Sequence, residues 1–329
     1  MTTPSARFIL RLVVTLGGLA LVIRLGLPQG QDGVTALLRS AWVVPPLEGW
    51  SWFGVALALF GASYAVGALR FRDLLASANM EIHYPPLLRA YIVASFFNLV
   101  LPGLIMGDVY RLADARRDAG SGARVLGIVV LERLLGFSAL GSMALLAAPW
   151  LPGETPSSVR WGVGVFGGLV TLGPLLLLTQ PGQQLARVLA QQLGRLNASA
   201  ASAGGQAVEA IEQAGEHRVV IARTFGLSVL NQWLPVLAVV ALAMPLDAEV
   251  ALHWYAVIIP FVTLASLLPI SIGGTGVREA LFVALFGAVG MRPEVALVLS
   301  LSTLAVALSW GLLGLAFFLV GRRARAVPA

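Results

Sequence analysis

The chain has 329 residues, of which 58% are hydrophobic and 12% are charged, and its mean hydropathy is +0.85. Soluble domains are about 45–50% apolar and about 25% charged, so this composition excludes a soluble protein and predicts an all-α integral membrane protein. The formal charge is +6 without any lysine, and the absence of cysteine excludes disulfides and thiolate metal sites. In a membrane protein, an arginine excess indicates topology and anionic headgroups rather than nucleic acid.

Apolar runs of roughly 20 residues, the length that crosses a bilayer, predict about six spanning helices. They cover residues 8–27, 51–69, 125–148, 159–179, 219–244 and 295–320. The runs are continuous, whereas the strands of a membrane β-barrel would alternate. Arg7 and Arg11 precede the first run as they would in a signal peptide. Because Arg24 interrupts its end and no cleavage site follows, we expect a retained helix.

The run 88–106 has arginines on both flanks and does not fit a single span. Arginines mark cytoplasmic flanks, and those here are Arg70, Arg72, Arg89, Arg111, Arg116, Arg117 and Arg124. Since both flanks are then cytoplasmic, the chain must turn inside the membrane, and Leu101-Pro102-Gly103 supplies the break. We expect a re-entrant hairpin over residues 88–118. A non-helical turn at that depth is tolerated only inside protein or beside a water-filled cavity.

The polar stretch 181–218 is predicted to be a cytoplasmic amphipathic connector. Its apolar residues recur at helical spacing opposite Gln and Arg, which is typical of a helix lying on the membrane surface. These residues are Leu185, Val188, Leu189, Leu193 and Leu196. The segment from Ser199 to Gly205 contains only small residues and is expected to be a flexible linker between the halves.

The second half is predicted to repeat the first in the opposite orientation. A proline and three glycines between Leu267 and Phe282 interrupt an apolar run, so we expect a second re-entrant hairpin over 252–290. The order span, span, hairpin, span then occurs twice, with both termini in the cytoplasm. Residues 1–180 contain the first repeat, and 219–325 contain the remainder of the second. Inverted repeats of this kind place binding sites at broken helices near the bilayer midplane.

The first hairpin carries candidates for binding a phosphate. Asp108 and Arg111 are three residues apart and share a helix face, while Asn98 precedes the break and Gly103 lies in it. A helix that begins near Gly107 points free N–H groups into the turn, which favours an anion beside Arg111. The alternative is that Asp108 caps this helix and pairs with Arg111 at the cytoplasmic surface.

Glu132 and Arg133 lie inside an otherwise apolar run. Each charge at such a depth costs about 2.5–3.5 kcal/mol on insertion scales, and charges of this kind commonly face a cavity and mark a substrate path. The alternative is a structural pairing with Arg111 or Asp108.

The second hairpin offers a backbone site for an anion. Successive glycine amides can form an anion-binding nest, although glycines also serve close helix packing. The candidates are Ser271, Gly273, Gly274, Gly276, Arg278 and Glu279. Gly164 and Gly168, in the run 159–179, are expected to serve a close helix crossing.

Other polar and aromatic residues are interpreted as structural. Asn231 and Gln232 lie in a span and are expected to bond neighbouring helices. Tryptophans gather at the predicted outer ends of spans, as interfacial anchors do. They are Trp50, Trp52, Trp150, Trp161 and Trp254.

Three motifs in this order resemble those of the lysylphosphatidylglycerol synthase transmembrane (flippase) family, in a stand-alone form without the soluble synthetase domain. They are N-x-x-L-P-G-x-x-x-G-D-x-x-R from Asn98 to Arg111, E-R at Glu132-Arg133, and P-I-S-I-G-G-x-G-x-R-E from Pro269 to Glu279. Met106-Gly107 departs from the glycine pair that the family pattern has before the Asp. The resemblance implies the movement of aminoacylated phosphatidylglycerol, polyprenyl-phosphate or hopanoid-related lipids between leaflets.

The leading hypothesis is therefore a lipid flippase working by alternating access in a bacterial or archaeal cytoplasmic (inner) membrane. The two hairpins are expected to meet near the midplane around an anionic headgroup, without a cofactor or metal. The expected partners are that membrane lipid, a second copy in a homodimer, and a separate lipid-modifying enzyme. The alternatives are a membrane enzyme acting on a lipid phosphate and a scaffold that transports nothing.

Overall fold

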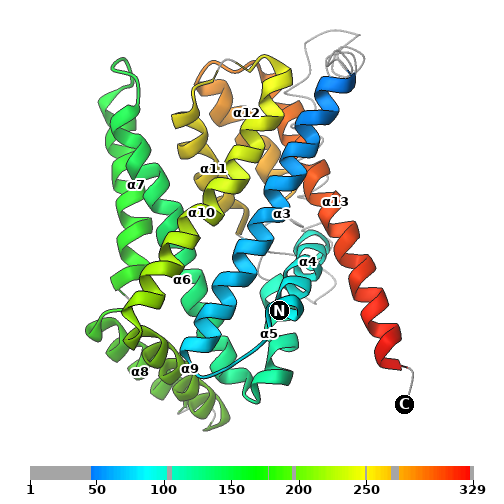
Figure 1. The fold of residues 1–329 in the computed structure, drawn as a ribbon. Coiled ribbons are helices and arrows are strands. Elements are labelled where there is room, and N and C mark those ends of the chain that lie inside the picture. The colour runs from blue at the N-terminus through cyan, green and yellow to red at the C-terminus, as the bar shows by residue number, and fades with distance from the viewer. Residues whose placement is uncertain are drawn as a thin grey trace, which may run out of the picture. The chain divides into compact units, whose positions relative to one another are not determined.

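The computed structural model describes residues 46–101, 106–176, 178–194, 198–248, 250–267 and 274–326. The described part is helical and contains no strand (Figure 1). Its helices are α3 (Pro46–Ser77), α4 (Tyr84–Val100), α5 (Met106–Ala119), α6 (Gly122–Ala147), η1 (Ala148–Trp150), α7 (Ser157–Leu176), α8 (Gln180–Gly194), α9 (Ala198–Glu216), α10 (Arg218–Ala243), η2 (Met244–Leu246), α11 (Leu252–Leu267), α12 (Val277–Ala288) and α13 (Pro293–Ala326). The all-α prediction is confirmed.

Five segments of the described residues are long and apolar enough to cross a membrane. They are Gly49–Ser77, Gly122–Trp150, Ser157–Leu176, Arg218–Leu246 and Pro293–Gly321. Each coincides with a span predicted from the sequence, and the remaining predicted span, 8–27, lies outside the described residues. A polytopic membrane protein is therefore confirmed, while the total of six spans and the inverted repeat stay predictions.

The chain folds into two compact units. Unit 1 contains the described residues of Met1–Gly61, Ile92–Gly107 and Leu234–Ala329. Unit 2 contains those of Ala62–Tyr91 and Asp108–Trp233. Each unit is described by itself below.

In unit 1, α13 packs closely against the beginning of α3 and the end of α4. The indole of Trp310 donates a hydrogen bond to the carbonyl oxygen of Leu57 at 3.1 Å. A Cβ added to Gly61 would collide with the Trp310 ring, and one added to Gly314 would collide with the carbonyl oxygen of Ile92. Glycines therefore let the helix backbones approach here.

The break after α4 falls where the sequence predicts it. Helix α4 ends at Val100 and α5 begins at Met106, while Pro102 and Gly103 lie outside the described residues. The amide of Gly107 donates to the side-chain oxygen of Asn98 at 2.8 Å, and a Cβ on Gly107 would lie 2.8 Å from the carbonyl oxygen of Ala94. Asn98 thus fastens the two sides of the break together. A re-entrant position in the membrane stays a prediction.

Helices α11 and α12 form an antiparallel pair in unit 1. The ring of Tyr255, near the start of α11, lies 5.0 Å from the ring of Phe286, near the end of α12. At 1.5 Å per residue, α11 is about 24 Å long and α12 about 18 Å, so each is shorter than the roughly 30 Å hydrocarbon core. This geometry fits the predicted second hairpin. Ser271 and Gly273, in its turn, lie outside the described residues.

Unit 2 is built around α6, which packs against α7 through small residues. A Cβ on Gly141 would lie 2.6 Å from the Thr171 nitrogen, and one on Gly167 would lie 2.7 Å from the Leu145 nitrogen. The prediction for Gly164 and Gly168 is wrong, because a Cβ at either position meets nothing within 4 Å. Residues four apart share one face of a helix, but this spacing does not say which face of α7 meets α6. The face that does so carries Gly167 and Thr171.

The expectation of a flexible linker at 199–205 is also wrong, because these residues lie within α9. Helix α9 packs against α6 and α8 (Figure 1), and Ala210 and Ala214 are fully buried. A Cβ on Gly127 of α6 would collide with the backbone of Ala207. Small residues serve here as a close-packing stripe. Helix α8 is confirmed as a helix, and its position on a membrane surface stays a prediction.

Helix α3 continues beyond the predicted end of its apolar run. It reaches Ser77, and the chain then turns at Asn79, whose φ of 58° lies in the left-handed region. Arg70, expected on a cytoplasmic flank between two segments, therefore lies within the continuing helix, and its cytoplasmic position stays a prediction. No glycine or proline interrupts the chain between residues 70 and 77, so the helix carries Arg70 inside the unit.

Candidate functional site

Five charged side chains and one tyrosine, all from helices, form one network of contacts inside unit 2. This group, named the charge cluster here, comprises Arg70 of α3, Tyr91 of α4, Asp108 and Arg111 of α5, and Glu132 and Arg133 of α6. Four of these residues were candidates from the sequence, namely Asp108, Arg111, Glu132 and Arg133. The structure joins them in one network, although they come from separate segments of the chain.

Glu132 is the centre of the charge cluster, and only 6% of it is exposed. Its Oε2 accepts a hydrogen bond from Nη1 of Arg111 at 2.8 Å, and its Oε1 accepts one from the hydroxyl of Tyr91. Nη2 of Arg70 lies 3.7 Å from Oε1 and donates to the backbone carbonyl of Glu132 at 3.1 Å. Two guanidinium groups and a hydroxyl therefore compensate the charge of this carboxylate.

Arg111 is held on all sides and only 5% of it is exposed. Besides Glu132 it pairs with Oδ1 of Asp108, three residues earlier on the same helix. Its guanidinium carbon lies 4.2 Å from the ring centre of Tyr91 and 5.2 Å from that of Phe71, within the range of cation–π attraction. Two carboxylates and two rings thus stabilise this buried charge.

Asp108 connects Arg111 to the most exposed arginine of the charge cluster. Nε of Arg133 donates to Oδ2 of Asp108 at 2.5 Å, and Nη2 of Arg133 pairs with the same oxygen. The Arg133 side chain is 33% exposed, whereas those of Arg70 and Arg111 are almost fully buried. Asp108 does lie in the first turn of α5, as the capping alternative requires, but it is buried rather than placed at a surface.

The charge cluster carries a net positive charge, because three guanidinium groups face two carboxylates. Its hydrogen bonds are also incomplete: Nε of Arg70 is buried and has no partner among the described residues. Buried polar groups are nearly always paired in folded proteins, so an unpaired buried donor is noteworthy. Its guanidinium groups therefore exceed its carboxylates by one, and one donor of Arg70 has no partner among the described residues.

Arg70 and Tyr91 are the members that sequence reasoning missed. Arg70 ends an apolar run, where an arginine ordinarily marks the cytoplasmic flank. Tyr91 fits because Gly67 of α3 has no side chain: a Cβ there would lie 2.5 Å from the Tyr91 ring. The structural interpretation of Gln232 is confirmed, since its Nε2 donates to the carbonyl oxygen of Gly136 at 3.1 Å.

In the second predicted site, in unit 1, the charged side chains and a backbone amide bond one another within one helical turn. Glu279 is fully buried, and its Oε2 accepts the amide N–H of Gly276 at 2.5 Å at the start of α12. Nε and Nη2 of Arg278 both donate to its Oε1, at 3.1 and 2.6 Å. Gly274 and Gly276 have φ values of 76° and 88°, which favour glycine. Glu279 therefore caps the start of its own helix and forms an ion pair with the adjacent Arg278.

Metal chemistry receives no support from the described ranges, in which no three His, Cys, Asp or Glu residues are grouped to hold an ion. The charge cluster is instead suited to anion binding, because guanidinium groups bind phosphate and carboxylate through directed hydrogen bonds.

A family model described as the lysylphosphatidylglycerol synthase TM region matches residues 8–316 of the chain. The match includes the charge cluster, both broken-helix segments, four spans of the described residues in full and the fifth, Pro293–Gly321, as far as residue 316. No curated protein and no solved structure matches the chain.

Proposed function

This chain belongs to the family of lysylphosphatidylglycerol synthase transmembrane regions, and we propose that it is a flippase for an anionic lipid. The family is one of membrane proteins of lipid metabolism or transport. The observation that carries the finer proposal is the net positive charge of the charge cluster, whose side chains come from α3, α4, α5 and α6.

Embedding these side chains in a membrane protein is costly. Each charge near the bilayer centre costs about 2.5–3.5 kcal/mol on insertion scales, and such residues usually mark the path of a substrate or ion. Each arginine of the charge cluster has an ion-pair partner, but the three guanidinium groups share two carboxylates. A lipid phosphate would supply the remaining countercharge while its chains stay in the hydrocarbon.

Arg133 is the arginine best placed to receive that phosphate. It is the most exposed of the three, and its partner Asp108 is already shared with Arg111. A phosphate that pairs with Arg133 leaves Asp108 to Arg111, so every carboxylate of the charge cluster keeps a guanidinium partner. The Nε group of Arg70 is a spare donor deeper in the same network.

Transport is favoured over chemistry on the headgroup. A general base must be able to accept a proton from the substrate. Oxygens of both carboxylates of the charge cluster are instead occupied by hydrogen bonds from guanidinium groups. We propose alternating access as the mechanism, with the charge cluster open to each leaflet in turn.

The test is leaflet-resolved transport in proteoliposomes that contain fluorescent phosphatidylglycerol, lysylphosphatidylglycerol or phosphatidylcholine. The full chain is compared with Arg133→Gln and with Arg187→Gln, whose exposed arginine pairs with Glu212 between α8 and α9. Arg133→Gln should slow transport at least tenfold, and Arg187→Gln should leave it unchanged. Wild-type transport rates in a folded Arg133→Gln protein would overturn the proposal, as would a chemically altered headgroup.

A further inference from the structure

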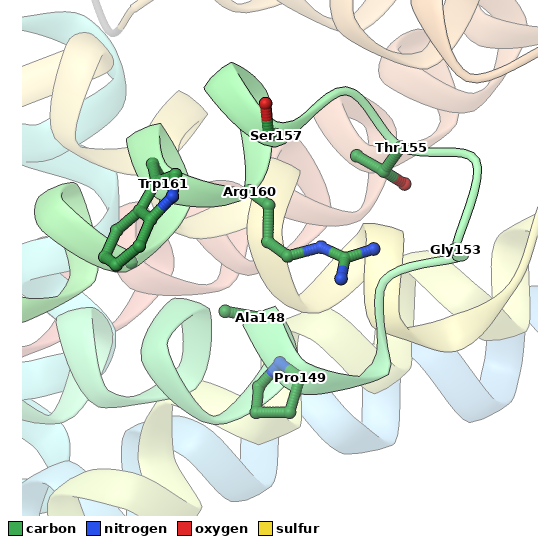
Figure 2. Close-up of a pocket in the computed structure, with 8 residues that line it drawn as sticks. Ala148, Pro149, Gly153, Thr155, Ser157, Arg160 and Trp161 are labelled. Carbon is green, nitrogen blue, oxygen red and sulfur yellow. The ribbon is translucent and has the colours of Figure 1, made fainter.

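A cavity of about 630 Å³ lies at the end of the α6–α7 hairpin. It is lined by Ala148, Pro149, Gly153, Thr155, Ser157, Arg160, Trp161 and Gly164. Figure 2 shows the guanidinium of Arg160 extended into the space between the 153–155 loop and the Ala148–Pro149 turn. From Glu132 to Ala148 the helix advances about 24 Å, so this cavity is separate from the charge cluster.

The lining combines one cation with apolar walls. Nη2 of Arg160 donates to the carbonyl oxygen of Pro152 at 2.9 Å, which ties the side chain across the loop. An arginine has five N–H donors, so this bond leaves most of them for a ligand. No acidic residue lines the cavity, and Glu154 belongs to the same loop without lining it. The cavity is therefore complementary to an anion with an apolar part.

The surroundings of the cavity match the level of lipid headgroups. Trp161 lines the cavity, Trp150 follows the lining residue Pro149 in the chain, and the two are 75% and 77% exposed. Tryptophan favours the membrane–water interface, and both residues lie at the ends of segments able to span a membrane. The phosphate of a phospholipid lies at this level, with its acyl chains directed along the exposed apolar face of α7.

Glycine keeps one wall of the cavity open. A Cβ added to Gly164 meets nothing within 4 Å, and neither does one added to Gly168, which does not line the cavity. A large side chain at position 164 would therefore fill the cavity without disturbing the α6–α7 contact, which uses the face of Gly167. Position 168 provides a matched control one turn further along the helix.

We propose that this cavity binds the phosphate of an anionic phospholipid, with Arg160 as the charged ligand and Trp161 beside the glycerol region. The proposal concerns binding at the interface and does not depend on transport through the charge cluster. A free phosphate ion shares the charge of the headgroup but has no apolar part to occupy the walls formed by Ala148, Pro149 and Trp161.

The chain contains no cysteine, so one introduced cysteine can report on this cavity alone. The exposed Ser158, which does not line the cavity, is replaced by cysteine in the full chain and labelled with an environment-sensitive fluorophore. The purified protein is titrated with dihexanoyl phosphatidylglycerol, dihexanoyl phosphatidylcholine and inorganic phosphate. We expect saturable binding of the first at a Kd at least tenfold lower than for the other two.

Arg160→Gln and Gly164→Leu should each raise the Kd for dihexanoyl phosphatidylglycerol at least tenfold, whereas Gly168→Leu and Arg187→Gln should leave it unchanged. Size-exclusion profiles and circular dichroism confirm folding of each variant. Equal binding of the two lipids would overturn the anion preference, and equal binding of inorganic phosphate would overturn the lipid assignment. Unchanged binding in Arg160→Gln would overturn the site itself.

Discussion

The charge cluster of unit 2 and the turn at Gly276–Glu279 of unit 1 have similar sequences and different structures. Each follows a glycine-containing break in an apolar run, and each contains an acidic and a basic residue at the start of a helix. In unit 2 the pair Asp108 and Arg111 extends to Glu132 and Arg133 of α6 and to residues of α3 and α4. In unit 1, Glu279 bonds its own helix start and the adjacent Arg278.

The difference shows that the spacing of two charges on one helix does not determine whether their partners come from the same helix or from neighbouring ones. Asp108 and Arg111 face three neighbouring helices, so their charges find partners far away in the chain. Glu279 is satisfied by Gly276 and Arg278, both within the three residues that precede it. The first arrangement has one positive charge in excess and an unpaired donor on Arg70, whereas the second pairs one acid with one base. Our proposal of anion binding therefore concerns the first arrangement alone.

Replacing Glu132 should have the largest effect on stability. Glu132→Gln leaves the buried guanidinium groups of Arg111 and Arg70 without the carboxylate they share. Removing one partner of a buried ion pair costs about 3–5 kcal/mol, so we expect a loss of that size in the free energy of unfolding. Thermal and denaturant unfolding of the purified protein in detergent measures it. A loss below about 1 kcal/mol would show that water or relaxation compensates the arginines.

Replacing Glu279 should cost less, although this residue is more deeply buried than Glu132. The amide of Glu279→Gln can still accept the N–H of Gly276, since glutamine also serves in a capping box. The Arg278 side chain is 14% exposed, so its guanidinium is less completely buried than those of Arg70 and Arg111. We expect a loss of about 1 kcal/mol, typical of one hydrogen bond, in the same unfolding measurement. A loss equal to that of Glu132→Gln would remove the distinction between the two sites.

The sequence predicts the helices and breaks of this protein better than the partners of its charges. Continuous apolar runs locate five spans, because burial in lipid requires length and apolarity without regard to helix face. The cost of membrane charge likewise identifies Glu132 and Arg133. Arg70 escapes this reasoning because an arginine at the end of a run fits both a cytoplasmic flank and a buried ion pair, and only the continuation of α3 decides between them.

The sequence likewise does not determine which small residues make helix contacts. The runs at 164–168 and 199–205 have spacings that fit a helix contact or a linker, and the outcome depends on which face meets α6. Gly167 and Ala207 make the contacts because of helix rotation, which spacing alone does not specify. Membership of the charge cluster is equally hard to predict from spacing, since Tyr91 belongs to it only because Gly67 leaves room for its ring.

The smallest effect is expected outside both sites, at Arg223 of α10. Its guanidinium lies 3.3 Å from Asp73, but the side chain is 57% exposed and Arg72 also bonds Asp73, at 2.9 Å. Because the acid keeps a partner and the arginine is already hydrated, Arg223→Gln should change the free energy of unfolding by less than about 1 kcal/mol. Measured beside Glu132→Gln, it separates the loss of a charge in general from the loss of a buried, shared one. An equal loss in the free energy of unfolding for Arg223→Gln and Glu132→Gln would mean that the stability of unit 2 depends on its total charge. The buried ion pairs of the charge cluster would then contribute no more to stability than an exposed pair.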